Sequence, residues 1–292
     1  MVSVCRIRSN HNLTGEFSRF IDMKTYCTMI LLVFSTLLAG SAFAQKLVIM
    51  GSDTLGTKMM PKFKEAYVAK GHKVDFEIAA EGSSQGFANL LSGTADIGMS
   101  SREAKDEEKI NFIAKGEELV EHLVGWDMVA VIVNAENGVR KLTLREIEGI
   151  FTGDIEDWSE IGGKPGKISV YTRNTASGTY DTFQQVAMRT RDYGSNSQKM
   201  AGTEQVASEV AANPNGIGYV GLAYAEKKGV RSLKVDGIAA KAKNKAEYPL
   251  SRKLYFYTVD EPKGESQKFL TWALKTKEGK DLVKKVGFIP AD

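Results

Sequence analysis

The regular alternation of short apolar runs with amphipathic segments is the feature that most constrains the fold of this chain. Residues 46–50 (KLVIM) form an apolar run that stops at a glycine, which predicts a buried strand. Met59, Phe63 and Tyr67 then recur at a spacing of four residues, as on one face of a helix. Such alternation predicts a parallel sheet covered by helices. The expected order is strand 46–50, helix 59–67, strand 73–78, helix 83–91 and strand 95–99.

A second α/β set follows without a flexible linker, and 292 residues are enough for two cores. Two long apolar runs, 122–133 and 252–259, are interpreted as crossovers between the sets. We therefore predict an α/β fold with two lobes hinged at the crossovers: 45–127 plus 252–292, and 128–251. The second set consists of strands 168–171, 217–220 and 232–235 and helices 144–151, 177–188, 203–212 and 222–227.

The N-terminal segment has the order typical of a secretory signal peptide. Lys24 precedes the apolar run 30–39 (ILLVFSTLLA), which is too short to span a bilayer, and the small-residue motif Ala-Phe-Ala at 42–44 follows it. We expect residues 1–44 to be removed and the protein to be exported to the periplasm. Because residues 1–22 are long and partly acidic for a leader, we expect translation to start at Met23.

Composition excludes several classes of protein. A hydrophobic content of 42% argues against disorder, and 39 basic against 36 acidic residues leaves no basic excess for a nucleic-acid partner. Both cysteines, Cys5 and Cys27, fall in the predicted leader, and only His72 and His122 of the histidines follow it. The exported chain should therefore have no disulfide, thiol nucleophile, metal site or cofactor, as suits a bacterial periplasm.

Glycines and hydroxyl residues gather where predicted strands give way to helices. One such turn is usually a helix cap, but four of them, two containing an arginine, indicate an oxyanion site. Backbone N–H groups and hydroxyls donate to the anion, and each charge-assisted bond from arginine contributes about 1.5–3 kcal/mol. The four junctions are 51–55 (GSDTL), 81–86 (EGSSQG), 98–102 (GMSSR) and 173–179 (RNTASGT).

The longest recognisable segment is 142–183, LTLREIEGIFTGDIEDWSEIGGKPGKISVYTRNTASGTYDTF. With 51–55 (GSDTL), 96–102 (DIGMSSR), 216–220 (GIGYV) and 248–252 (YPLSR), it resembles the phosphate-binding proteins of bacterial Pst-type ABC importers. The resemblance implies a two-lobed, type II-like periplasmic binding protein that closes on inorganic phosphate. It also implies a monomer without catalytic activity, which delivers phosphate to the permease subunits of an inner-membrane ABC importer.

The resemblance also suggests which residues bind the anion, and two positions depart from the family pattern. Some members carry an aspartate at the position of Ser101, where it accepts the phosphate proton, and some an acidic residue at the position of Thr175. Asp53 could take over the acceptor role, or it could cap the turn that follows it. The expected ligand set is Asp53, Thr54, Leu55, Ser83, Ser101, Arg102, Arg173, Ser177, Gly178 and Thr179.

Two other functions remain open from the sequence. The same donors could serve a binding protein for another tetrahedral oxyanion, such as sulfate, molybdate or tungstate. Residues 82–86 also fit the G-x-S-x-G pattern of serine hydrolases, with Ser84 as nucleophile. That pattern requires a later acid and then a histidine, and the last histidine of the chain is His122, only 38 residues further on.

Overall fold

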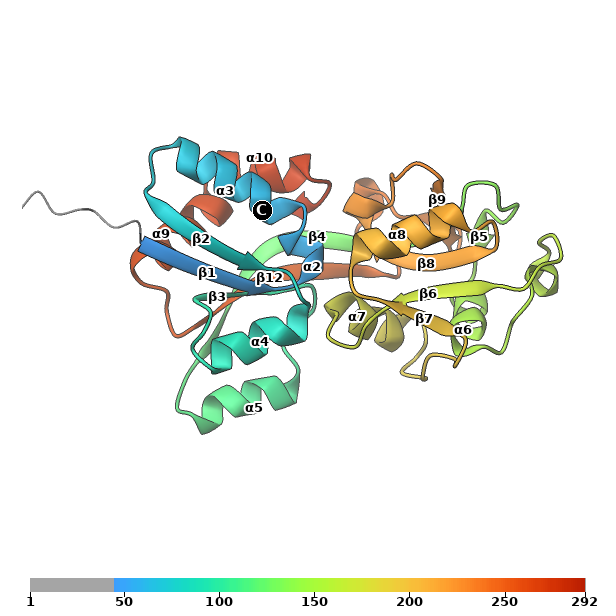
Figure 1. Cartoon of the computed structure of the whole chain (residues 1–292), viewed down its shortest axis with the longest axis horizontal. Helices are drawn as coiled ribbons and strands as arrows, with labels where there is room; N and C mark the ends of the chain where they lie inside the picture. Colours follow the sequence, from blue (N-terminus) through green and yellow to red (C-terminus); the bar gives the residue numbers. More distant parts are fainter. Residues whose placement is uncertain (1–44, 292) are drawn as a thin grey trace, which may run out of the picture. The chain divides into compact units, whose positions relative to one another are not determined.

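The computed structural model describes residues 45–291, so the predicted signal peptide lies outside the described residues. Within the compact unit Ala44–Asp292, a ten-stranded sheet has the main order β2-β1-β3-β12-β4-β8-β6-β7 (Figure 1). Its strands are β1 Gln45–Gly51, β2 Val74–Ala79, β3 Ile97–Ser100, β4 Leu119–Asn134, β6 Ser169–Arg173, β7 Ser197–Met200, β8 Gly216–Gly221, β9 Val230–Ser232, β12 Ser251–Val259 and β13 Ile289–Pro290. A small sheet contains β5 Lys141–Leu142, β10 Lys234–Val235 and β11 Ile238–Ala239.

Helices cover both faces of this sheet, as the alternation in the sequence predicts (Figure 1). In the first half, α3, α9 and α10 lie on one face and α4 and α5 on the other; in the second half, α8 lies opposite α6 and α7. The helices are α2 Asp53–Gly56, α3 Met59–Ala69, α4 Ser83–Leu91, α5 Asp106–Ala114, α6 Leu144–Thr152, α7 Gly178–Val186, α8 Thr203–Ala212, α9 Gly264–Lys275 and α10 Lys277–Lys285, with short 3₁₀ turns η1 Trp158–Ile161, η2 Leu222–Tyr224 and η3 Ala242–Asn244.

Strand β12 organises the core of the first half because its side chains alternate between the faces of the sheet. Leu254 and Phe256 pack with α3 and α9. Tyr255 and Tyr257 point to the opposite face, into the cluster formed by α4 and α5. Apolar residues therefore fill both sides of a strand with the sequence LYFYTV, as expected for a sheet sandwiched between helices.

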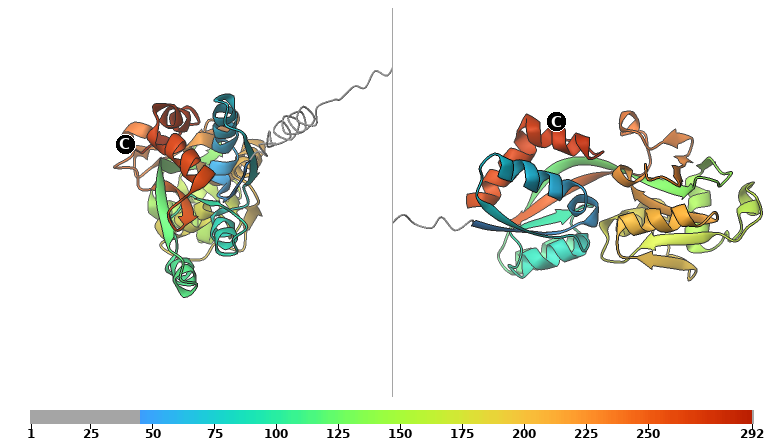
Figure 2. Two further views of the ribbon diagram at one scale, coloured as in Figure 1. Left: turned by 90° about the vertical axis from the view of Figure 1, so that its left-hand side faces the viewer. Right: turned by 45° about the horizontal axis from the view of Figure 1, so that its top comes forward.

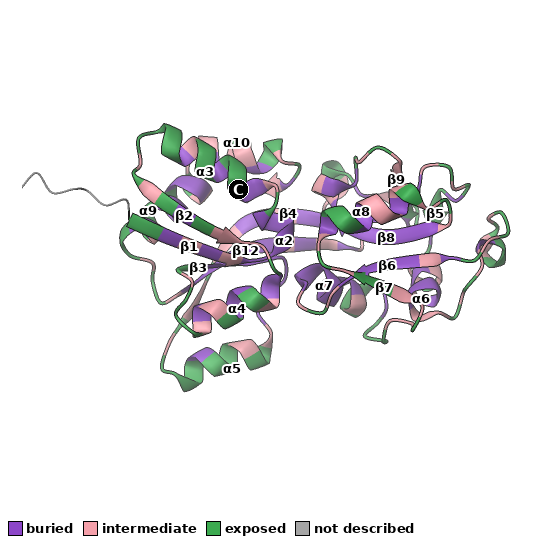
Figure 3. Cartoon of the chain, in the orientation of Figure 1, coloured by how far each residue is buried: buried purple, intermediate pink, exposed green. Residues whose placement is uncertain are grey.

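Strand β4 belongs to both halves of the molecule. Its residues 119–128 pair with β12, whereas residues 129–133 pair antiparallel with β8. Figure 2 shows β4 and β12 passing together between the halves, and Figure 3 shows that they are largely buried. The two-lobed α/β fold is thus confirmed, with a strand crossing as expected from the apolar run 122–133.

The hydrophobic cores change at the two crossovers. Val124 belongs to the first core and Met128 to the second; on the returning strand, Leu250 belongs to the second core and Leu254 to the first. These changes support the lobe boundaries inferred from the sequence, 127/128 and 251/252, and we keep these boundaries and the hinge between them as a proposal.

Two predicted elements are wrong in extent, and the helices α2 and α5 were not predicted. The helix expected at 222–227 is only the turn η2, because Gly229, with a φ of 92°, turns the chain back into β9. The strand expected at 232–235 is divided at Leu233 into β9 and β10, which pair with different partners. Helix α5 was not predicted from the sequence because it buries only one side chain, Phe112, and shows no apolar stripe.

No helix among residues 45–291 combines the length and apolar character that a membrane crossing requires.

Candidate functional site

The first three junctions meet at one edge of the sheet because β1, β2 and β3 are parallel and end together. Backbone bonds tie them: Gly82 N–H donates to the Gly51 carbonyl and Ser52 N–H to the Met99 carbonyl, both at 2.8 Å. The side chain of Ser83 then accepts from Ser101 N–H at 3.0 Å. Parallel pairing thus brings three sequence-distant junctions to one place.

The fourth junction approaches this edge from the second lobe. Ser84 N–H donates to the Ala176 carbonyl at 3.1 Å, and the hydroxyl oxygens of Thr54 and Thr179 lie 3.1 Å apart. Gly178 permits the approach, since a Cβ there would lie 2.4 Å from Ser83 Oγ. All four junctions predicted from the sequence are therefore in contact.

Arg173 is the buried cation of this cluster. It ends β6 and is 1% exposed, with Nη1 bonded to Asp53 Oδ2 at 2.9 Å and to Thr203 Oγ1 at 2.6 Å. Its Nη2 donates to the Ala201 carbonyl at 2.8 Å. Burial lowers the pKa of Arg173, and the charge of Asp53 opposes that shift, so the guanidinium remains charged at neutral pH.

One donor of this guanidinium has no partner within the described chain. Nε of Arg173 is buried and makes no hydrogen bond to residues 45–291. A buried donor usually has a partner, because leaving it unpaired costs about 1–3 kcal/mol. This orphaned donor points to a ligand with an acceptor oxygen.

Asp53 is the counter-ion and also a helix cap. Its Oδ2 accepts from Arg173 and from the N–H of Thr203, the first residue of α8, at 2.9 Å. Its Oδ1 accepts from Thr57 Oγ1 at 3.0 Å. The carboxylate therefore caps a helix of the other lobe rather than its own turn, a possibility that local sequence could not reveal.

The hydroxyl of Ser177 serves helix α7 directly. Its oxygen accepts from the N–H groups of Thr179 and Tyr180 at 3.2 and 3.3 Å, which leaves the hydroxyl proton for another acceptor. Leu55 is fully buried within α2, so only its backbone could contribute to a ligand.

Arg102 lies at the edge of the cluster, where its Nη2 donates to Ser84 Oγ at 3.0 Å, but most of its bonds go to carboxylates. Its Nε donates to Asp181 Oδ2 at 2.8 Å, and Nη1 and Nη2 bind the two oxygens of Glu108 at 2.7 Å each. Burial would lower the pKa of Arg102, but Glu108 and Asp181 raise it overall. Because carboxylates occupy its fork, we leave Arg102 out of the ligand set and interpret it as an ion-pair link between the lobes.

Sequence reasoning missed two buried residues beside the cluster, Arg252 and Asp127. Arg252 Nη1 donates to Thr179 Oγ1 at 2.9 Å, and its Nη2 donates to Asp127 Oδ2 at 2.7 Å. A signal existed for each. Arg252 ends the YPLSR segment, and Asp127 is a lone carboxylate within the apolar run 122–133.

The hydrolase alternative finds no support in the geometry. Ser84 Oγ accepts from Arg102 Nη2 at 3.0 Å, an arrangement that supplies no general base. His72 stacks on Tyr67 with ring centroids 3.9 Å apart, and His122 Nε2 bonds to Thr258 Oγ1 at 2.9 Å. Among residues 45–291 no group of acidic, histidine or cysteine side chains could hold a metal ion.

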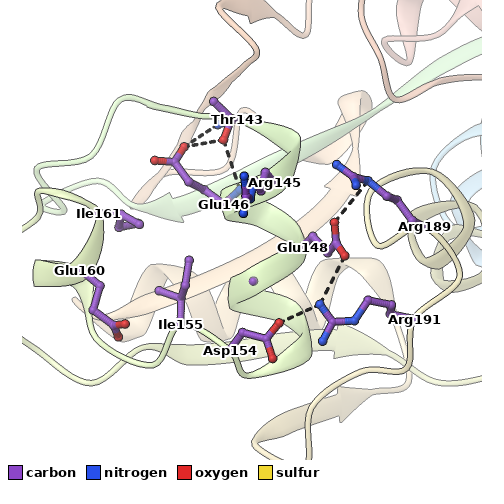
Figure 4. A pocket seen from close by; sticks show the side chains of 11 residues that line it. Thr143, Arg145, Glu146, Glu148, Asp154, Ile155, Glu160, Ile161, Arg189 and Arg191 are labelled. Carbon is purple, nitrogen blue, oxygen red and sulfur yellow. Dashed lines mark hydrogen bonds and ion pairs between the residues drawn. The ribbon is translucent and has the colours of Figure 1, made fainter.

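A cavity of about 690 Å³ beside α6 is a different feature, shown in Figure 4. Two of its arginines are paired: Arg191 binds Glu148 and Asp154, and Arg189 also binds Glu148. The third arginine, Arg145, lines the cavity together with Glu146 and Glu160, so acidic side chains outnumber basic ones and do not favour an anion.

Comparisons with known proteins identify the family of this chain. Residues 39–277 match the model of the PBP superfamily domain. The phosphate-binding protein PstS of Bacillus subtilis is 31% identical over 246 residues, covering 84% of this chain and 80% of the relative. The chain belongs to the PstS family of phosphate-binding proteins.

Further relatives of the family extend the comparison. PstS of Pseudomonas aeruginosa is 32% identical over 275 residues, covering 86% of this chain and 84% of that protein. A crystal structure of a phosphate ABC transporter substrate-binding protein from Clostridium perfringens, with bound phosphate, is 35% identical and superimposes with a TM-score of 0.78. The match covers 85% of this chain and all of the Clostridium chain.

The contact at Gly178 predicts the effect of adding one methyl group. In Gly178→Ala, the new Cβ would overlap Ser83 Oγ and push the lobes apart. Such overpacking costs about 1–3 kcal/mol and weakens the bond from the Ser84 amide to the other lobe. Hydrogen exchange at this amide should therefore become roughly tenfold faster or more. The control is Gly138→Ala, where nothing lies within 4 Å of the added Cβ. Unchanged exchange at Ser84 would contradict the close approach.

Proposed function

We propose that this chain binds inorganic phosphate between its two lobes and delivers it to an ABC permease. The observation that carries the proposal is the buried, orphaned Nε of Arg173 beside a cluster of hydroxyls. The start of α7 lies in the same cluster, and the positive end of a helix favours an anion. The phosphate bound in the Clostridium relative supports the choice of anion.

The proposed site combines one strong cation with neutral donors from both lobes. Arg173 supplies Nε, and Thr54 and Thr179 supply hydroxyls that already lie face to face. Ser83 and Ser101 contribute from the first lobe at 0 and 1% exposure. The remaining members are Leu55, Ser177 and Gly178, whose backbone N–H groups or hydroxyl are the donors, with Asp53 as proton acceptor.

The proposal also covers the location of the protein, its oligomeric state and its partner. We place it in the bacterial periplasm after removal of residues 1–44, as a monomer that meets the inner-membrane permease subunits in its closed form. We assign it no catalytic step, because a trap for phosphate has only to bind and release its ligand.

Selectivity separates phosphate from the alternative oxyanions. Phosphate keeps a proton at neutral pH and sulfate does not, so a fixed carboxylate acceptor favours phosphate. Calorimetric titration of residues 45–292, refolded to remove bound anion, should show one site that prefers phosphate over sulfate and molybdate by roughly tenfold or more. Equal or tighter binding of sulfate or molybdate would overturn the proposal.

Arg173 should carry much of the affinity for phosphate. Arg173→Ala leaves the buried anion and Asp53 without a cation beside them, so calorimetry should show a loss of about 2–5 kcal/mol in binding free energy. Arg173→Lys should restore only part, because an ammonium lacks the planar fork. The exposed Arg145→Ala is the matched control. A loss below about 0.5 kcal/mol in Arg173→Ala would remove Arg173 from the site.

Asp53 should set the ratio of phosphate to sulfate affinity. Asp53→Asn exchanges a charged acceptor for an amide that can donate, so phosphate binding should weaken by about 1–3 kcal/mol relative to sulfate. Thermal unfolding of the same variant separates this role from capping of α8. If Asp53 only caps Thr203, the melting temperature falls while the ratio of anion affinities stays the same.

A further inference from the structure

The ion pair of Asp127 and Arg252 lies where the two crossover strands meet. The two residues are direct partners in the antiparallel ladder of β4 and β12, at the point where the hydrophobic cores change. Their side chains are 0 and 4% exposed. A buried pair at this position can contact residues of both lobes.

Asp127 fixes the guanidinium of Arg252 and connects it to the second lobe. Its Oδ2 accepts from Arg252 Nε at 3.1 Å and from Nη2 at 2.7 Å. Its Oδ1 accepts from Leu222 N–H, at the start of η2, at 2.9 Å. Both oxygens of the carboxylate are therefore engaged by protein donors.

The outer nitrogens of Arg252 reach one hydroxyl in each lobe. Nη1 donates to Thr179 Oγ1 at 2.9 Å and Nη2 to Thr54 Oγ1 at 3.4 Å. Arginine has no acceptor, so both threonine oxygens must accept these bonds. In this structure one of the two hydroxyls donates to the other, since their oxygens lie 3.1 Å apart. An anion placed beside the pair can instead receive both protons.

We infer that Arg252, clamped by Asp127, is a positioning residue that aligns the Thr54 and Thr179 hydroxyls as donors to the bound anion. This inference rests on the proposed phosphate function. It adds a residue that affects phosphate binding by orienting the side chains that contact the anion. The pair also makes hydroxyl alignment depend on lobe closure, because Thr54 and Thr179 reach the same guanidinium only when the lobes meet.

A double-mutant cycle on phosphate affinity tests this role. Arg252→Lys keeps the charge but loses the fork, and should weaken phosphate binding roughly tenfold or more. In a Thr179→Val background, which lacks the aligned hydroxyl, the same change should cost less than about threefold. Arg102→Lys is the control, because Arg102 bonds to Asp181 and Glu108 instead, so its effect should be the same in both backgrounds.

Asp127→Asn provides a second test, because the positioning role and a simple charge effect predict opposite changes in phosphate affinity. If Asp127 acted only as a nearby negative charge, its removal would tighten the binding of an anion. As a clamp, its loss lets the Arg252 guanidinium shift, so phosphate binding should weaken, again less in Thr179→Val. This variant also replaces Arg252→Lys if the latter does not fold.

The outcomes separate this inference from the proposed function. If the parent protein fails to bind phosphate, the proposed function falls, and the inference falls with it. If the parent binds phosphate but Arg252→Lys and Thr179→Val act additively, or Asp127→Asn tightens binding, the positioning role alone is overturned.

Discussion

A guanidinium buried between two lobes is the constraint on which the rest of this structure depends. Removing a charge from water costs several kcal/mol unless it is well paired, and Arg173 takes its counter-ion, Asp53, from the opposite lobe. Arg252 is likewise buried and is paired with Asp127 at the strand crossing. Closure of the lobes therefore brings Arg173 and Asp53 together, and Arg252 bonds to the hydroxyls of Thr54 and Thr179, one from each lobe.

Much of the fold could be predicted because local pattern and tertiary structure agree. The run KLVIM is a strand, and 83–91 and 203–212 are helices with the expected bounds, since apolar spacing and Ser or Gly starts determine both. The junctions could be found because parallel strands end at a common edge. Their individual roles as phosphate ligands remain predictions.

The remaining features of the fold and the site depend on contacts between distant segments, which the spacing of residues along the chain does not reveal. Arg102 looked like a ligand because it follows Ser101, yet Glu108 and Asp181 occupy its fork. Asp127 and Arg252 are 125 residues apart and became neighbours only through the register of β4 and β12. Helix α5 was missed because it buries so little that periodicity is absent.

The central claim is that phosphate lies between the lobes on Arg173. A crystal structure of residues 45–292 grown with phosphate tests it most directly. The account predicts a phosphate oxygen within hydrogen-bond distance of Arg173 Nε, with the Thr54 and Thr179 hydroxyls on the same anion. Phosphate bound elsewhere, with Arg173 Nε still unpaired, would contradict it.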